Sequence, residues 1–174
     1  MKLFNTKVTI AKTYFKGKHF LEIEGMLEFD QNGYPEDIVF FRIFEDMEFR
    51  NKEKQYAMQL TSTDIRDLCE ACRELILCKC KSIEYKKETR KSPKSTMKSL
   101  KVGAVSKEDS WTYYINIETG RKKAAVSFNK YQIRTFVKKI EFLAQKVEES
   151  LYAYQKMLSL TLLKHKEQQN KQGR

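Results

Sequence analysis

The sequence contains little of what catalytic sites are usually built from. Its 174 residues include two His, six Gly and two Pro. Neither a glycine-rich phosphate loop nor a dinucleotide fingerprint is present. His19 and His165 are too few and too scattered to suggest a His-based metal site or a catalytic triad. We therefore expect no cofactor and no catalytic residue, and a binding protein rather than an enzyme, although carboxylates alone can support catalysis.

Long apolar runs are also missing. No segment approaches the roughly 20 apolar residues of a membrane span, and the N-terminus leads directly into strand-like alternation without an apolar signal core. We expect a soluble, cytoplasmic protein with no membrane partner. The hydrophobic fraction of 41%, with 11 Phe and nine Tyr, is nevertheless enough to build a core. The length predicts one compact domain, or two small halves that share a core.

Cysteine is confined to one short cluster, Cys69, Cys72, Cys78 and Cys80. Cys69 and Cys72 fall on the apolar face of a predicted helix, where a reduced cysteine is typically a small core residue. A zinc knuckle would need its two cysteine pairs on turns that converge, and disulfides are rare in a reducing compartment. We expect core cysteines and no metal site, with structural zinc as the alternative.

Acidic residues are scarce in the second half of the chain. Residues 1–80 carry 12 Lys/Arg and 14 Asp/Glu, whereas residues 81–174 carry 22 Lys/Arg and nine Asp/Glu, for a net charge of +11 overall. This asymmetry makes a polyanion the first partner to consider. The alternative is that the lysines only keep the surface soluble.

Alternating apolar and polar residues predict four strands and then a helix in each half. The first half reads as strands over 6–15, 19–29, 37–45 and 55–61 and a helix capped at 62–64 that ends near 79. The second half reads as strands over 82–90, 96–106, 110–119 and 122–128 and a helix capped by Asn129. The two joints resemble each other, with Thr61-Ser-Thr-Asp-Ile-Arg matching Asn129-Lys-Tyr-Gln-Ile-Arg.

These elements predict an α+β fold of duplicated β-β-β-β-α units, with twisted antiparallel sheets backed by helices. The predicted units are residues 1–80 and 81–168, followed by a disordered tail over 169–174. The last helix would run about 60 Å, from Asn129 to about 168. Its apolar positions form a heptad seam, Ile133, Val137, Ile140, Ala144, Val147, Leu151, Tyr154, Leu158 and Thr161. We expect a homodimer through this helix; the alternative is that it folds back over both sheets of its own chain.

Sheets backed by helices leave one face open. Such a face binds single-stranded nucleic acid where it offers cations for phosphates and flat rings for bases. The candidate residues are Lys12, Phe15, Lys16, Lys18, Phe20, Lys98, Lys101, Tyr114, Arg121, Lys122 and Lys123. For each single ring the alternative is a place in the core, and Tyr14 and Phe15 cannot both point outwards. Glu22, Glu24 and Glu28 share one strand face, which we expect to be a solvent face rather than a metal site.

Three segments resemble known single-stranded nucleic-acid-binding proteins. Residues 8–23, which contain Phe15-Lys-Gly-Lys, look like the opening hairpin of the coactivator Positive Cofactor Four. Residues 120–129, which begin Gly-Arg-Lys-Lys, resemble the step into that family's helix. Lys122-Lys-Ala-Ala-Val is similar to the Whirly motif Lys-Gly-Lys-Ala-Ala, with Lys123 in place of the glycine, and the duplication is similar to the Whirly and Pur-alpha folds.

The resemblance implies twisted sheets that bind single-stranded nucleic acid on one face, through Phe15, Lys16, Lys18 and Arg121, Lys122, Lys123. The hairpin match lies in one half and the Gly-Arg-Lys match in the other, so neither half carries the whole pattern. Our hypothesis is a protein that binds single-stranded DNA, or RNA, with little sequence specificity, in replication, recombination or transcription. The alternative is a coiled-coil interaction or scaffold protein whose basic charge is incidental. A nuclease would need a constellation of residues that the sequence does not offer.

Overall fold

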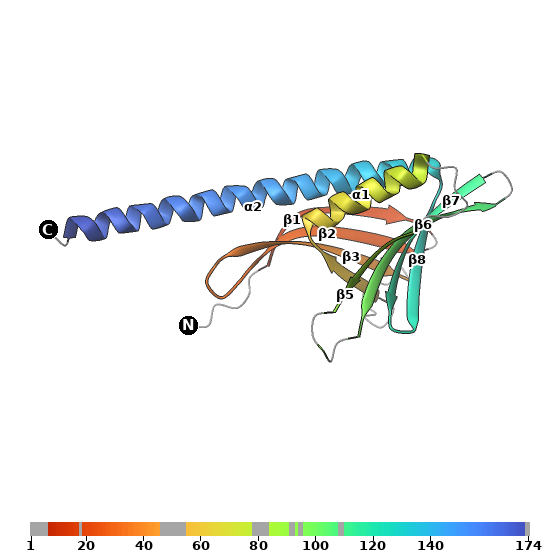
Figure 1. Ribbon diagram of the computed structural model, residues 1–174, viewed down its shortest axis with the longest axis horizontal. Coiled ribbons are helices and arrows are strands. Elements are labelled where there is room, and N and C mark those ends of the chain that lie inside the picture. Colours follow the sequence, from red (N-terminus) through yellow and green to blue (C-terminus); the bar gives the residue numbers. More distant parts are fainter. Residues whose placement is uncertain are drawn as a thin grey trace.

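The computed structural model describes residues 7–17, 19–45, 55–77, 84–90, 93, 96–107 and 110–172. Two four-stranded antiparallel sheets, each followed by a helix, confirm the predicted α+β fold (Figure 1). Sheet A consists of β1 (Lys7–Lys16), β2 (Phe20–Phe29), β3 (Pro35–Phe44) and β4 (Gln55–Leu60), and α1 (Ser62–Leu77) follows it. Sheet B consists of β5 (Glu84–Thr89), β6 (Lys98–Lys107), β7 (Ser110–Thr119) and β8 (Lys122–Phe128), and α2 (Lys130–Gln172) follows it. Strand order equals chain order in both sheets, so β1, β4, β5 and β8 are edge strands.

The two helices begin with matching capping boxes. The Thr61 hydroxyl accepts a hydrogen bond from the Asp64 amide at 3.2 Å, and the Asp64 carboxylate accepts one from the Thr61 amide at 3.0 Å. Asn129 and Gln132 exchange the equivalent bonds at 2.8 and 2.9 Å. The first helix is therefore capped by Thr61, one residue before the predicted 62–64, because this hydroxyl reaches the orphan amide at the start of the helix. The same joint at the same place in both halves supports the duplication.

Both sheets and both helices share a single hydrophobic core. The two helices lie side by side and are joined by the ion pairs Arg66–Glu148 and Arg73–Glu141. Helix α2 crosses sheet A so closely that a Cβ on Gly25 would fall 2.5 Å from Val147 Cγ2. A glycine at this position of β2 thus sets how near the helix approaches the sheet.

The end of sheet A meets sheet B. The Lys98 ammonium on β6 donates a hydrogen bond to the Ala57 carbonyl on β4 at 3.0 Å. At the other edge, Gly17 in the turn between β1 and β2 lies beside β8, where a Cβ would fall 3.9 Å from the Ser127 carbonyl oxygen. The β1–β2 turn therefore stands at the exposed edge of sheet B.

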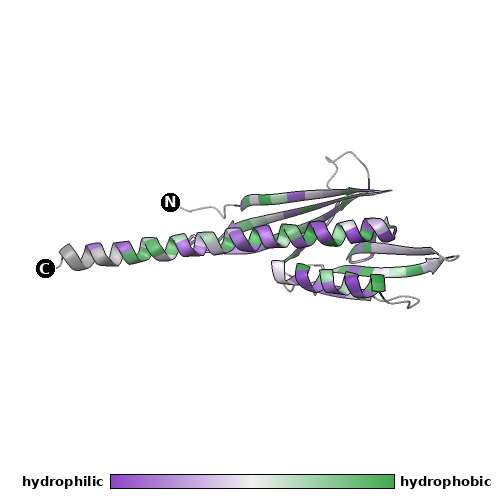
Figure 2. Cartoon of the chain, turned by 90° about the horizontal axis from the view of Figure 1, so that it is seen from above, coloured by the Kyte–Doolittle hydropathy of each residue, from purple (hydrophilic) through white to green (hydrophobic). Residues whose placement is uncertain are grey.

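The long helix outruns both sheets (Figure 1). The predicted seam residues from Ile133 to Val147 are buried within the chain, and Tyr154 makes the last ring contact, with Phe29 at 4.7 Å between centroids. Beyond it the helix projects with hydrophobic residues still on its surface (Figure 2). The helix ends at Gln172, so residues 169–172 continue it rather than forming a separate tail. No helix in the described ranges holds an apolar stretch long enough to cross a bilayer.

The cysteines of α1 pack as predicted. Cys69 and Cys72 are both buried. Burial raises the pKa of the Cys69 thiol to about 12 and also raises the pKa of Cys72. Neutral thiols at these positions fill space in the core. Cys78 and Cys80 lie outside the described residues.

Candidate nucleic-acid interface

The side of sheet B that faces away from the core forms a shallow surface, here called the sheet B face. Its central residues alternate with buried neighbours such as Val102, Ile115 and Val126. They are Ser99, Lys101 and Gly103 on β6, Thr112, Tyr114, Asn116 and Glu118 on β7, and Lys123, Ala125 and Ser127 on β8. Around the one aromatic ring described on this face these side chains are small, and on β5 the same side carries the Lys86–Glu88 ion pair.

That ring belongs to Tyr114 and lies across the neighbouring strand. Tyr114 and Gly103 are partners in the β6–β7 register. A Cβ on Gly103 would fall 2.3 Å from the Tyr114 hydroxyl oxygen and 2.4 Å from its Cζ. The ring therefore occupies the space that any other residue at 103 would fill. A half-buried ring held over the sheet in this way is a platform of the kind on which bases stack.

Cations lie further along the same face, with Lys101 opposite Asn116 and Lys123 opposite Glu118 in the strand register. The Lys101 ammonium lies 3.1 Å from a Glu118 carboxylate oxygen, and this hydrogen bond lowers the pKa of Glu118. Arg121, Lys122 and Lys123 are exposed at the turn into β8, which Gly120 makes possible with a φ of 60°. None of these three forms an ion pair with a carboxylate in the described part of the chain. Lys123 faces Glu118 across the strands and helps to lower the pKa of that carboxyl, so Arg121 and Lys122 are the charges left to an anionic ligand.

A second group of rings lies at the end of sheet A nearest to β8. The Tyr14 and Phe20 centroids are 5.4 Å apart, and the Phe20 and Phe44 centroids are 6.2 Å apart. Phe20 is 8% exposed and Tyr14 is 45% exposed, so Tyr14 presents this row to solvent. Tyr14 was not among the binding residues predicted from the sequence. Its alternation with Lys12 and Lys16 was the signal that would have placed it on the outer side.

Phe15 points to the opposite side of β1. Its ring packs against Phe128 and Phe136, with centroids 5.9 and 5.2 Å away. Of the two alternatives left open, Tyr14 is therefore outside and Phe15 is against the core. Lys16 is exposed at the end of the same strand, and Lys18 lies outside the described residues.

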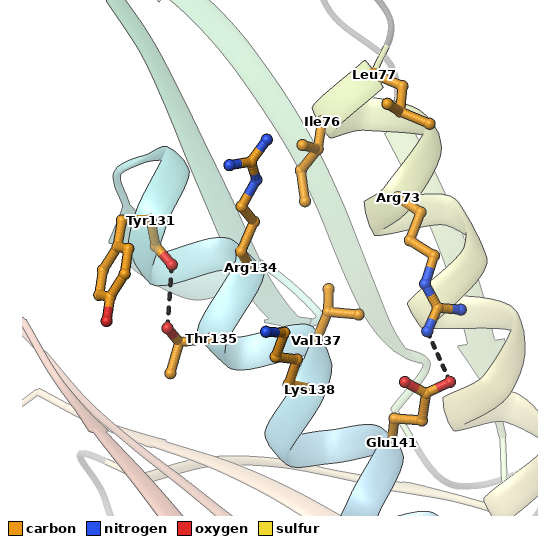
Figure 3. A pocket seen from close by; sticks show the side chains of 9 residues that line it. All are labelled: Arg73, Ile76, Leu77, Tyr131, Arg134, Thr135, Val137, Lys138 and Glu141. Carbon is orange, nitrogen blue, oxygen red and sulfur yellow. Dashed lines mark hydrogen bonds and ion pairs between the residues drawn. The ribbon is translucent and has the colours of Figure 1, made fainter.

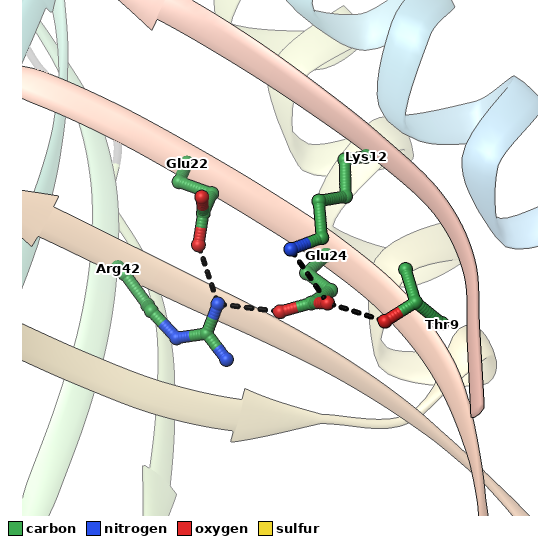
Figure 4. Close-up of polar contacts among 5 residues, drawn as sticks. All are labelled: Thr9, Lys12, Glu22, Glu24 and Arg42. Carbon is green, nitrogen blue, oxygen red and sulfur yellow. Dashed lines mark hydrogen bonds and ion pairs between the residues drawn. The ribbon is translucent and has the colours of Figure 1, made fainter. Parts of the chain in front are cut away.

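The outer face of sheet A is neutralised by its own ion pairs (Figure 4). Glu24 accepts hydrogen bonds from Thr9 at 2.6 Å, from Lys12 at 2.9 Å and from Arg42 at 2.6 Å. Arg42 also pairs with Glu22. Glu24 is buried, so the expected solvent face is wrong at this residue, because cross-strand cations enclose the carboxylate. Burial opposes its ionisation, but the three hydrogen bonds outweigh burial and lower the pKa of Glu24 to about 2.

The structure divides the predicted residues into three groups. Lys101, Tyr114 and Arg121–Lys123 meet on or beside the sheet B face. Lys16 and Phe20 lie beyond the far end of β8, about 20 Å from Lys122 at the usual rise per strand residue. Lys12 is bound to Glu24, Lys98 is bound to Ala57, and Phe15 packs on Phe128 and Phe136. These three therefore have structural contacts, and the predicted binding role of Phe15 is wrong.

A cavity lies on the helix layer, between the end of α1 and the start of α2 (Figure 3). Its volume is about 650 Å³. Arg73 in its wall is paired with Glu141 at 2.6 Å, and Ile76, Leu77 and Val137 supply apolar surface. Over the described ranges, no group of three or more His, Cys, Asp or Glu residues could hold a metal ion. The cavity therefore offers packing surface rather than a set of reactive groups.

Comparison with known proteins finds a likeness in fold only. No protein-family model matches the chain, and no curated protein matches its sequence. Among solved structures, the plant transcriptional regulator PBF-2 matches with a TM-score of 0.48 and 16% identity, over 89% of this chain and 90% of that one. WHY1 from Arabidopsis thaliana matches with 0.45 and 12% over 83% and 92% of the chains. WHY3 from the same plant matches with 0.48 and 13% over 92% and 97%.

These three proteins are Whirly proteins. At such low identity, individual binding residues do not carry over from one chain to the other.

Proposed function

We propose that this protein binds single-stranded nucleic acid on the sheet B face. The observation that carries the proposal is the Tyr114 ring, laid over Gly103 among small side chains, with cations further along the same face. Every base has a flat face, so stacking on such a ring accepts any sequence. Arg121 and Lys122 would neutralise phosphates, which adds affinity that falls as salt rises.

The finer properties are part of the same proposal. Low sequence specificity follows from stacking and phosphate contacts, since neither reads base edges. Single-stranded DNA is favoured over RNA on the resemblance of residues 8–23 to the hairpin of Positive Cofactor Four. We place the protein in the cytoplasm, as a passive binder in replication, recombination or transcription.

Fluorescence anisotropy with 5′-labelled dT20 tests this function. We expect saturable binding at 50 mM salt that weakens strongly at 200 mM, and much weaker binding to the dT20·dA20 duplex. A matched rU20 strand measures the preference for DNA. Equal affinity for single strand and duplex, or no saturable binding at low salt, would overturn the proposal.

A homodimer through the projecting part of α2 is a second proposal. Between Ser150 and Leu163 the helix carries one charged residue, Lys156. Apolar side chains are exposed there on more than one side, at Tyr152, Met157, Leu160, Leu162 and Leu163. Covering these apolar side chains stabilises the helix, and the same segment of a second copy offers a matching apolar surface.

Size-exclusion chromatography with light scattering tests the dimer. We expect the full chain to elute with twice the mass of 20.7 kDa and a variant lacking residues 155–174 to be a monomer. The truncation spares Tyr154, which packs on Phe29, and should bind dT20 with reduced avidity. A monomeric full chain would favour the alternative in which this helix recruits a different protein.

A further inference from the structure

A groove runs along the free edge of sheet A, between β1 and α2. Two adjoining cavities of about 190 and 290 Å³ form it, and they share Thr135 and Lys139 in their walls. The strand contributes residues 11–16 and the helix contributes residues 131–143. Six strand residues and thirteen helix residues each span about 20 Å. The groove is therefore long and narrow, with matching walls.

The charge of this β1–α2 groove is of one sign. Its lining contains Lys12, Lys16, Lys138 and Lys139 and no carboxylate. Lys12 is bound to Glu24. Lys16, Lys138 and Lys139 form no ion pair with any carboxylate that the structure describes. Three uncompensated ammonium groups along one narrow channel raise the local concentration of an anionic ligand.

Exposed rings alternate with these cations. Tyr131 is 78% exposed and Phe142 is 59% exposed, although both lie on the sheet-bound half of α2. Their spacing of 11 residues places them three turns apart on one side of the helix. Lys139 lies between them, over the Phe15 ring at 5.1 Å. Flat rings and ammonium groups in alternation are what a single strand requires.

The groove begins where the sheet B face ends. Phe128, the last residue of β8, lines the first cavity together with Tyr14 and Lys16. Gly17 lies beside Ser127 on the same strand. Gly17 also lies 3.7 Å, measured from an ideal Cβ, from the Val126 side chain on the opposite side of β8, so a ligand that follows β8 from Lys123 to Ser127 reaches the mouth of the groove by crossing the edge of this strand.

We propose that the nucleic acid continues from the sheet B face into the β1–α2 groove. Its phosphates are held by Lys16, Lys138 and Lys139, and its bases lie against Tyr131 and Phe142. This inference rests on the proposed function, since it extends the same binding path. An acidic peptide added to the β1 edge would use the same lysines, but the continuity with β8 and the exposed rings favour a nucleic acid.

The double variant K138Q/K139Q tests the groove. Its matched control is K164Q/K171Q, which removes the same charge from the C-terminal end of the helix, beyond the segment 150–163 proposed for the dimer. We expect the groove variant to bind dT20 at least 10-fold more weakly than the control. The slope of log affinity against log salt should fall by about 1.4, since each lost phosphate contact on a single strand removes about 0.7. Thermal unfolding by circular dichroism confirms that both variants are folded.

Photocrosslinking provides a second measurement on the unmodified protein. A dT20 strand containing 5-bromodeoxyuridine should crosslink to Tyr131 or Phe142 as well as to Tyr114, as mapped by mass spectrometry. If the wild-type chain binds no dT20, the proposed function fails. If it binds, but the groove variant equals its control and crosslinks are confined to sheet B, this inference alone fails. Labelled poly-L-glutamate binding that is lost in K138Q/K139Q while dT20 binding is unchanged would assign the groove to an acidic polypeptide and also overturn it.

Discussion

Tyr114 and Gly103 are cross-strand partners, and the Tyr114 ring fills the space that a side chain on residue 103 would occupy. The Tyr114 hydroxyl oxygen lies 2.3 Å from the point that a Cβ on residue 103 would occupy. Any side chain at 103 must therefore lift the ring away from the sheet. The shape of the binding surface around Tyr114 on β7 therefore depends on glycine at position 103 of β6.

This pair predicts the effect of two substitutions on oligonucleotide binding. Y114A should weaken dT20 binding by about 1–3 kcal/mol, the usual contribution of one stacked base. G103A should also weaken it, because it displaces the ring without removing it. Anisotropy titrations measure both, and Y114F is the control that keeps the ring. A loss of affinity in Y114F equal to that in Y114A would show that the ring does not stack.

The turn into β8 predicts a change in salt dependence. R121Q/K122Q should reduce the slope of log affinity against log salt by about 1.4, for two lost phosphate contacts. The control K164Q/K171Q makes the same change in net charge far from the sheet B face and should leave the slope as it is. Titrations with dT20 at several salt concentrations supply the slopes. Equal slopes for both variants would mean that the binding responds to net charge only.

The Glu24 network predicts how stability depends on pH. Folding lowers the pKa of Glu24 from 4.5 to about 2. Above pH 4.5 both the folded and unfolded states are ionised here, and the full stabilisation, of the order of 3 kcal/mol, is present. As pH falls from 4.5 towards 2, the unfolded state takes up a proton first, so this contribution is lost.

Urea unfolding of wild type and E24Q measures this contribution. E24Q should be less stable at pH 7, because Lys12 and Arg42 lose a charged partner. The difference between the two proteins should shrink as pH falls from 4.5 towards 2. A difference that stays constant over this range would show that the network acts through shape and not through charge.

The contact between Gly25 and Val147 predicts a packing effect. In G25A the new Cβ would fall 2.5 Å from Val147 Cγ2 and 2.8 Å from Leu143 Cδ2. Overpacking of this kind costs about 1–3 kcal/mol, which lowers the melting temperature by about 2–4 °C per kcal/mol in a protein of this size. Adding V147A should restore part of the loss. Calorimetry of G25A, V147A and the double variant measures the three changes in stability. If the two single effects simply add, this contact is not the cause of the loss.

Local patterns predicted much of the fold. The predicted strand 110–119 has the observed bounds, and Asn129 forms the capping box that its position suggested. Such features depend on neighbours in sequence, because caps, turns and strand alternation involve residues a few positions apart. The repeated joint at Thr61 and Asn129 was visible for the same reason.

The binding surface depended on contacts that cross strands and sheets. Alternation placed Tyr114 on the opposite side from Trp111, but Gly103 beneath it comes from another strand. Lys12 and Lys16 share one side of β1, yet the first is held beside a buried carboxylate that Arg42 also binds, whereas Lys16 forms no ion pair in the described part of the chain. Whether a lysine charge is available to a ligand depends on which carboxylates the register brings within reach.

The amino-acid sequence alone specified the two β-β-β-β-α units, their caps and the excess of cations in the second half, because each is a property of composition or of short-range spacing. The folded chain settled which cations stay uncompensated, which of Tyr14 and Phe15 faces outwards, and how the end of β8 meets the β1–α2 groove. Those outcomes depend on pairing between residues distant in the chain. Such pairing is set by the packing of two sheets against one long helix, and no local pattern encodes it.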